Sequence, residues 1–90
     1  MTKALISVTG LDATGIIARV ATRLSEMNIN ILDITQTILQ GKFTMVMAVD
    51  ISKAGVPLTE LAERLAELGQ SLGISICIQR EEIFNAMHRI

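Results

Sequence analysis

The sequence predicts a single α+β domain of the ferredoxin-like type, a βαββαβ sandwich whose antiparallel four-stranded sheet carries two helices on one face. A length of 90 residues allows one hydrophobic core but not two. Half of the residues are apolar, which is typical of a globular chain. The hydrophobic period changes along the chain in the order strand, helix, strand, strand, helix, strand. We therefore expect residues 1–90 to form one domain.

The first strand and the first helix are predicted from two different periods. Residues 3–9 alternate, with Ala4, Ile6 and Val8 on one face, as in a half-buried strand. Thr14 is expected to be the N-cap of the helix that follows, because its hydroxyl can accept a hydrogen bond from a free backbone N–H. The apolar stripe of this helix consists of Ile16, Ile17, Val20, Ala21, Leu24 and Met27.

The second half of the chain predicts a hairpin, a helix, a strand and a tail. Residues 31–40 and 43–51 are β-rich runs separated by a short turn that contains Gly41. Pro57 is expected to open the second helix and Gly73 to end it, with Gly69 inside it. Residues 74–80 form the last strand, and residues 81–90 form a short amphipathic helical tail.

The sheet face opposite the helices is expected to keep apolar residues. Val46 and Ala48 alternate with the core positions of the third strand, although an open face is usually polar. We expect Leu5, Ile31, Leu39 and Cys77 on this open face, and Ile6, Leu32 and Ile38 on the helix face. Such a patch predicts self-association through sheets or edge strands. The alternative is that these are ordinary scattered surface residues.

Composition excludes several classes of function. Eight Lys and Arg against nine Asp and Glu leave no basic run for nucleic acid. The apolar run after Lys3 is too short for a signal peptide or a membrane span, and the single Cys77 cannot form an intrachain disulfide, so we expect a cytoplasmic protein without a membrane partner. No Cys/His cluster has metal-ligand spacing, and no nucleophile or carboxylate motif accompanies Cys77 or His88. We therefore expect no catalytic residues, no metal and no cofactor.

The most informative segment is residues 10–16, where a strand turns into a helix between Gly10 and Gly15. Free N–H groups at the start of a helix attract an anion, and Asp12 beside them could receive a cation. Together they complement a zwitterion such as an α-amino acid. The simpler alternative is that Asp12 only caps the helix and Gly15 only lets it pack. A P-loop is excluded, because Ile16 and Ile17 stand where its Lys and Ser or Thr are required.

The same loop resembles the motif of the ACT domain family. Its pattern of Gly, any residue, Asp or Asn, two further residues, Gly and an aliphatic residue is similar to Gly10, Asp12, Gly15 and Ile16 here. The Asn-Ile that opens the second strand of the family resembles Asn30 and Ile31. The likeness covers residues 3–80. Length and tail are similar to small free-standing bacterial ACT proteins of the glycine-cleavage-repressor-like type.

The resemblance implies a regulatory protein and not an enzyme. In this family two domains pair, and a small amino-acid ligand, where bound, lies between the first loop of one subunit and the second-strand start of the other. It implies the ligand-binding residues Gly10, Leu11, Asp12, Ala13, Thr14, Gly15, Ile16, Asn30 and Ile31. ACT domains are usually fused to the enzyme that they regulate, so a regulated protein is a further expected partner of the homodimer. Some members bind no ligand and only mediate assembly, which leaves a dimerisation or adaptor module as the alternative.

Overall fold

The computed structural model describes residues 2–11 and 15–80 of the chain. Its elements follow the predicted order: β1 (Lys3–Leu11), α1 (Ile16–Glu26), β2 (Asn30–Leu39), β3 (Lys42–Asp50), α2 (Leu58–Leu72) and β4 (Ser75–Arg80). The ferredoxin-like βαββαβ arrangement is confirmed. The tail predicted at residues 81–90 lies outside the described residues.

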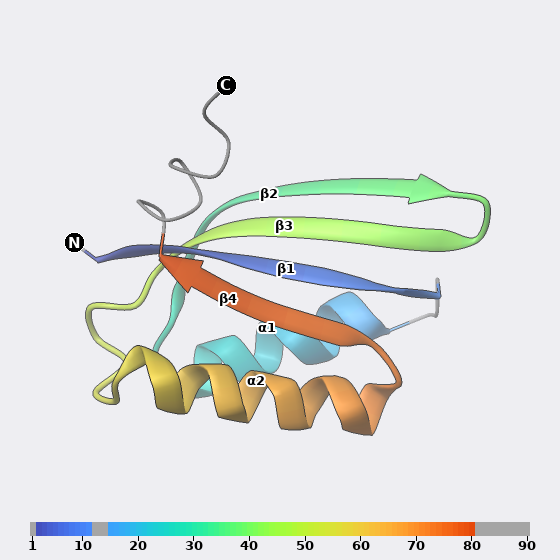
Figure 1. Cartoon of the computed structure of the whole chain (residues 1–90). Helices are drawn as coiled ribbons and strands as arrows, with labels where there is room; N and C mark the ends of the chain where they lie inside the picture. Colours follow the sequence, from blue (N-terminus) through green and yellow to red (C-terminus); the bar gives the residue numbers. More distant parts are fainter. Residues whose placement is uncertain (1, 12–14, 81–90) are drawn as a thin grey trace.

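The four strands form one antiparallel sheet in the order β2-β3-β1-β4. Both helices lie on one face of it, with α1 toward the β2 side and α2 toward β4 (Figure 1). Because β1 and β2 each run antiparallel to β3, they run in the same direction as each other. The end of β1 and the start of β2 are therefore at opposite ends of the sheet.

The core fills the space between the sheet and the two helices. Alternate residues of β1 and β3 point into it, as their period of two requires. Three residues of α1 and three of α2 meet them from the other side. The buried hydrophobic residues are Ala4, Ile6, Val8, Ile16, Val20, Leu24, Met27, Ile29, Phe43, Met45, Met47, Val49, Leu61, Leu65 and Ile76.

A β-bulge in β2 changes the predicted faces of this strand. Ile31 pairs with Val49 and Asp33 pairs with Ala48, so Leu32 is an extra residue on the bulged strand. Ile31 consequently shares the helix face with Val49, and the prediction that it lies on the open face is wrong. Leu32 is the inserted residue and not a regular helix-face position.

The other positions predicted for the two faces agree with the register where the structure describes them. Leu5 pairs with Ala48 on the open face, and Cys77 pairs there with Ser7. Ile38 pairs with Phe43 on the helix face, as expected. The side chain of Leu39 lies outside the described part of the structure.

The ends of α1 and α2 are defined by glycines. Gly15, with φ of 88°, is the N-cap of α1, so the prediction of Thr14 in that role is wrong. Gly73, with φ of 72°, ends α2, and the N–H of Ile74 donates to the carbonyl of Gly69 over 2.9 Å. This bond and the left-handed glycine form the predicted C-terminal cap. Gly69 lies inside the helix and is buried.

Candidate functional site

Gly10 and Ile16 are the parts of the predicted loop site that touch the core. A Cβ atom on Gly10 would lie 2.6 Å from Cγ2 of Ile74, so only glycine allows this approach of β1 to the α2–β4 connection. Ile16 is 6% exposed and anchors the first turn of α1 in the core. Both residues therefore have packing roles, Gly10 beside Ile74 and Ile16 in the core.

Leu11 and Gly15 face solvent at the same end of the sheet. Leu11 is 68% exposed, which is the largest value among the large hydrophobic residues that the structure describes. Gly15 accepts a hydrogen bond from the N–H of Arg19, and no side chain of the described residues caps α1. The first N–H groups of a helix have no intrahelical partners, and such groups favour an anion. Asp12, Ala13 and Thr14 lie outside the described residues.

Asn30 and Ile31 begin β2 at the other end of the molecule. Asn30 is exposed and pairs with Asp50, while Ile31 is partly buried against the core. Because β2 has 10 residues, its start lies roughly 30 Å from the end that carries the loop. Within one protomer the structure does not bring Asn30 and the loop together.

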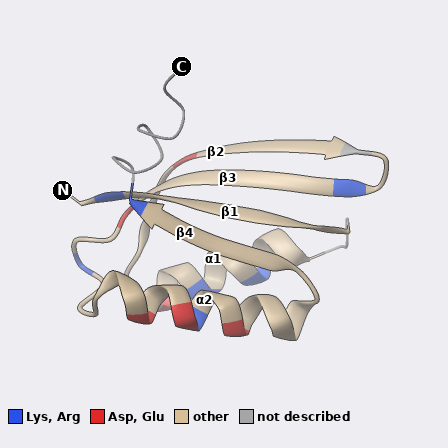
Figure 2. Ribbon diagram, in the orientation of Figure 1, with Lys and Arg blue, Asp and Glu red and all other residues tan. Residues whose placement is uncertain are grey.

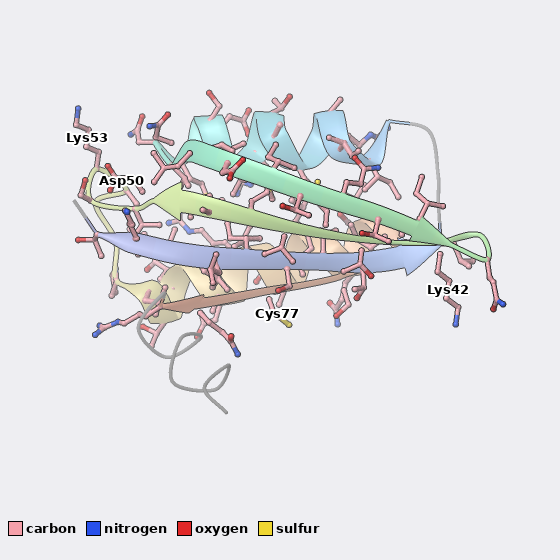
Figure 3. All side chains as sticks on the ribbon, turned by 90° about the horizontal axis from the view of Figure 1, so that it is seen from above. Lys42, Asp50, Lys53 and Cys77 are labelled. Carbon is pink, nitrogen blue, oxygen red and sulfur yellow. The ribbon has the colours of Figure 1, made fainter. Side chains whose placement is uncertain are left out.

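A pocket opens beside Asn30, at the junction of three segments of the chain. It has a volume of about 560 Å³, and we call it the Asn30 pocket. The end of α1, the start of β2 and the β3–α2 connection each contribute to it. Figure 3 shows Asp50 and Lys53 at this end of the molecule, while Lys42 lies at the other. The lining of the Asn30 pocket consists of Ser25, Asn28, Ile29, Asn30, Asp50 and Lys53.

Asp50 supplies a fixed negative charge to this pocket. Its Oδ1 accepts hydrogen bonds from the backbone N–H groups of Ser52 at 3.0 Å and Thr2 at 3.2 Å. The hydrogen bonds from Ser52, assisted by those from Thr2 and by the N-terminal charge, lower the pKa of Asp50 below its ordinary value. The carboxylate is therefore ionised at neutral pH. Asp50 and Lys53 were not predicted as site residues, because neither belongs to a recognisable motif in the sequence.

Charged residues are confined mainly to the helices and the ends of the strands (Figure 2). The described residues contain no group of three or more His, Cys, Asp and Glu side chains that could hold a metal ion. Cys77 is exposed and free, and His88 lies outside the described residues. No helix in the described ranges is long and apolar enough to cross a membrane.

The edge strand β2 is apolar on its surface. It pairs only with β3, so the N–H and C=O groups along its other edge have no strand partner among the described residues. Leu32, Ile34 and Ile38 are 39%, 44% and 55% exposed. Ile17 of α1, the helix on the β2 side, is 39% exposed. Edge strands of soluble proteins are usually protected by charged residues, Pro or a bulge; β2 has Asp33 and the bulge at Leu32 near its start, but no charged residue or Pro after Asp33.

Comparisons with known proteins, by family model and by solved structure, both lead to ACT domains. The family model described as ACT domain matches residues 2–79. A UPF0237 protein from Bifidobacterium longum is 51% identical over 90 residues, covering the whole of both chains. A UPF0237 protein from Methanocaldococcus jannaschii is 47% identical over 90 residues, again over the whole of both chains. The solved structure of an ACT domain protein from Streptococcus pneumoniae is 40% identical, covers 92% of this chain and 93% of that chain, and superposes with a TM-score of 0.82.

Proposed function

The chain belongs to the ACT domain family, and from this premise we propose that it is a regulatory protein that binds a small amino acid at the interface of a homodimer. The observation that carries the proposal is the placement of the two halves of the predicted site. Leu11, the last residue of β1 before the predicted loop, and Asn30, the first residue of β2, lie at opposite ends of one sheet. The loop half carries groups for both charges of a zwitterion, and Asn30 can add its amide hydrogen bonds to that ligand only from a second protomer.

A two-fold dimer through β2 would bring the two halves together. When two copies of an edge strand pair antiparallel, the partner's strand runs in the reverse direction. Asn30 of one protomer would then lie at the sheet end that carries the partner's loop. The free N–H groups of α1 and Asp12 from one protomer would face Asn30 and Ile31 of the other.

The surface of β2 supports this mode of pairing. The strand has an open backbone edge, and its exposed Leu32, Ile34 and Ile38 would be covered by a second copy. Ile17 on α1 would enter the same interface, since α1 lies on the β2 side (Figures 1 and 3). Burial of this apolar surface supplies the driving force for association. The proposed dimer therefore both protects the edge and completes the ligand site.

In the proposed complex the α-carboxylate of the ligand lies at the N-terminus of α1. Unpaired N–H groups and the helix dipole favour a negative group there. Asp12 receives the α-ammonium group, and Asn30 of the other protomer adds amide hydrogen bonds. In this arrangement each group binds or orients the ligand, and the Asp12 carboxylate pairs with the ammonium group instead of acting as a general base. We propose accordingly that the protein regulates a partner protein and does not catalyse a reaction.

We further propose a cytoplasmic location. Cys77 is exposed and free on the open face of the sheet. An exposed free thiol is suited to a reducing compartment.

A thermal-shift screen against the twenty amino acids tests the proposal. A ligand at 100 times its Kd stabilises the folded protein by about 2.7 kcal/mol. For a domain of this size each kcal/mol raises the Tm by roughly 4 to 8 °C. We expect one or a few amino acids to raise the Tm, and Asp12→Ala to abolish that shift.

The second candidate function is a ligand-free dimerisation or adaptor module. The open face of the sheet favours it, because Leu5, Val46 and Ala48 are only half-buried there. In that case no amino acid shifts the Tm and Asp12→Ala has no effect on function. Substitutions on the open face or in the tail, such as Val46→Lys or Phe84→Ala, would then abolish binding of the partner protein.

A further inference from the structure

The Asn30 pocket adjoins the place where the proposed dimer brings in the partner's loop. Asn30 is both the first residue of β2 and part of the pocket lining. A volume of about 560 Å³ exceeds that of any amino-acid side chain. A ligand that contacts Asn30 would therefore lie beside a pocket with room for its side chain.

The polar groups of the pocket carry both signs of charge. Asp50 is held in one position by the N–H groups of Ser52 and Thr2, which leaves its carboxylate able to accept further hydrogen bonds. Lys53 lies three residues later in the chain and lines the same pocket. Within the described residues the structure has no ion pair between Asp50 and Lys53, and its two ion pairs both lie on the helices. Both charged groups are thus available to a ligand.

Two amides complete the lining. Asn28 and Asn30 are exposed, and each amide offers donors and an acceptor. Asn28 lies in the turn after α1, where its own N–H donates to the carbonyl of Ser25 at 3.0 Å. Ile29 is the apolar member of the lining, and it is buried in the core.

We propose that the Asn30 pocket receives the side chain of the bound amino acid and selects an uncharged hydrogen-bonding side chain, that of serine, threonine, asparagine or glutamine, over an aliphatic one. This inference rests on the proposed function. An aliphatic side chain would displace water from Asp50, Lys53 and the amides without replacing its hydrogen bonds, which is unfavourable. A side chain of either charge would meet one like charge beside the opposite one, whereas a neutral hydroxyl or amide can donate to Asp50 and accept from Lys53.

Isothermal titration of the purified full-length protein with seven free amino acids tests this selectivity. The probes are serine, threonine, asparagine, glutamine, valine, leucine and isoleucine. We expect at least one of the first four to bind about tenfold or more tightly than the last three, since hydrogen bonds to charged groups contribute that much. Lys53→Met and Asp50→Asn should each weaken the polar ligand about tenfold while the dimer persists.

Three controls separate this inference from the proposed function. Glu63→Gln, on the exposed side of α2, makes the same carboxylate-to-amide change away from the pocket and should leave the affinity unchanged. Asp12→Ala should abolish binding of every amino acid. Among the described residues the Lys53 side chain makes no hydrogen bond and no ion pair that Lys53→Met would remove, so this variant remains informative if Asp50→Asn impairs folding.

If an aliphatic amino acid binds best and Asp12→Ala abolishes that binding, the selectivity proposal is wrong and the proposed function stands. The same conclusion follows if a polar amino acid binds equally well to Lys53→Met and to the unmodified protein. If none of the seven amino acids binds, the selectivity proposal is overturned, and the proposed function is overturned as well only if none of the twenty amino acids raises the Tm. Tight polar binding that Lys53→Met weakens and Glu63→Gln does not would establish both.

Discussion

Gly10 of β1 and Ile74 of the α2–β4 connection approach so closely that a Cβ atom on Gly10 would lie 2.6 Å from Cγ2 of Ile74 and 3.1 Å from its Cβ. The motif glycine therefore has a packing role at the end of β1. It lets the last strand begin directly beside the first, where Thr9 pairs with Ser75. This contact therefore stabilises the end of β1 against the start of β4.

Gly10→Ala should destabilise the protein by about 1 to 3 kcal/mol, as expected for overpacking of a filled site. Urea unfolding followed by circular dichroism measures the loss. In the background of Ile74→Ala, which removes the clashing methyl group, Gly10→Ala should be much less harmful. Equal losses in both backgrounds would show that the contact with Ile74 is not the cause.

Gly69→Ala, a substitution inside α2, should also lower the free energy of unfolding. Alanine normally favours a helix by roughly 1 kcal/mol over glycine. Here the new Cβ would lie 2.7 Å from the carbonyl oxygen of Ile74, a backbone atom that cannot rotate away. The net change in the free energy of unfolding should therefore be unfavourable, and a stabilised variant would contradict the close approach. Gln70→Ala, at an exposed neighbouring position, is the matched control.

The lowered pKa of Asp50 predicts a pH dependence of stability. The folded protein holds the carboxylate in its ionised form through the N–H groups of Ser52 and Thr2, so its pKa lies below the ordinary value of 3.8. The contribution of Asp50 is therefore fully present above pH 3.8 and is lost as the pH falls through the lower folded-state pKa.

Urea unfolding at pH 7 and at lower pH values, with and without Asp50→Asn, measures this contribution. The substitution should lower stability at pH 7, and the difference between the two proteins should shrink as the pH falls below 3.8. A difference that stays constant over that range would exclude Asp50 as the titrating group.

Ile38→Lys should prevent formation of the proposed dimer without unfolding the protomer. Ile38 is 55% exposed on the edge strand, so a lysine there has room in the isolated protomer. In the proposed two-fold interface each of the two lysines, at opposite ends of the paired strands, would bury a charge in an apolar contact. Light scattering should give the mass of two chains for the unmodified protein and of one chain for Ile38→Lys. Ala66→Lys, on the exposed side of α2, should remain dimeric.

The element order was predictable because strand and helix periods are separated by clear signals. Local sequence alone predicts the alternation in β1 and β3, the apolar stripe of α2 and the cap at Gly73. The bulge at Leu32 was not predictable, because an extra residue in a strand has no compositional signature. Thr14 was expected as N-cap from its hydroxyl, whereas the left-handed Gly15 occupies that position.

The candidate site was predictable only in part. The loop and Asn30 were named from their resemblance to a family motif, and nothing local to either segment reveals that they lie at opposite ends of the sheet. Asp50 and Lys53 come close to Asn30 only because the end of β3 pairs with the start of β2. That proximity depends on register across about 20 residues, which no short pattern encodes.

A mixing experiment with two binding-deficient variants tests the interface site most directly. Asp12→Ala removes the loop half from every protomer, and Asn30→Ala removes the strand half, so neither homodimer keeps an intact site. A mixed dimer has one site built from the intact loop of one protomer and the intact Asn30 of the other. We predict that the two variants, each inactive alone, regain amino-acid binding after unfolding and refolding together. About one site per mixed dimer should be recovered, measured by titration calorimetry; no recovery from the mixture would contradict a site shared between two protomers.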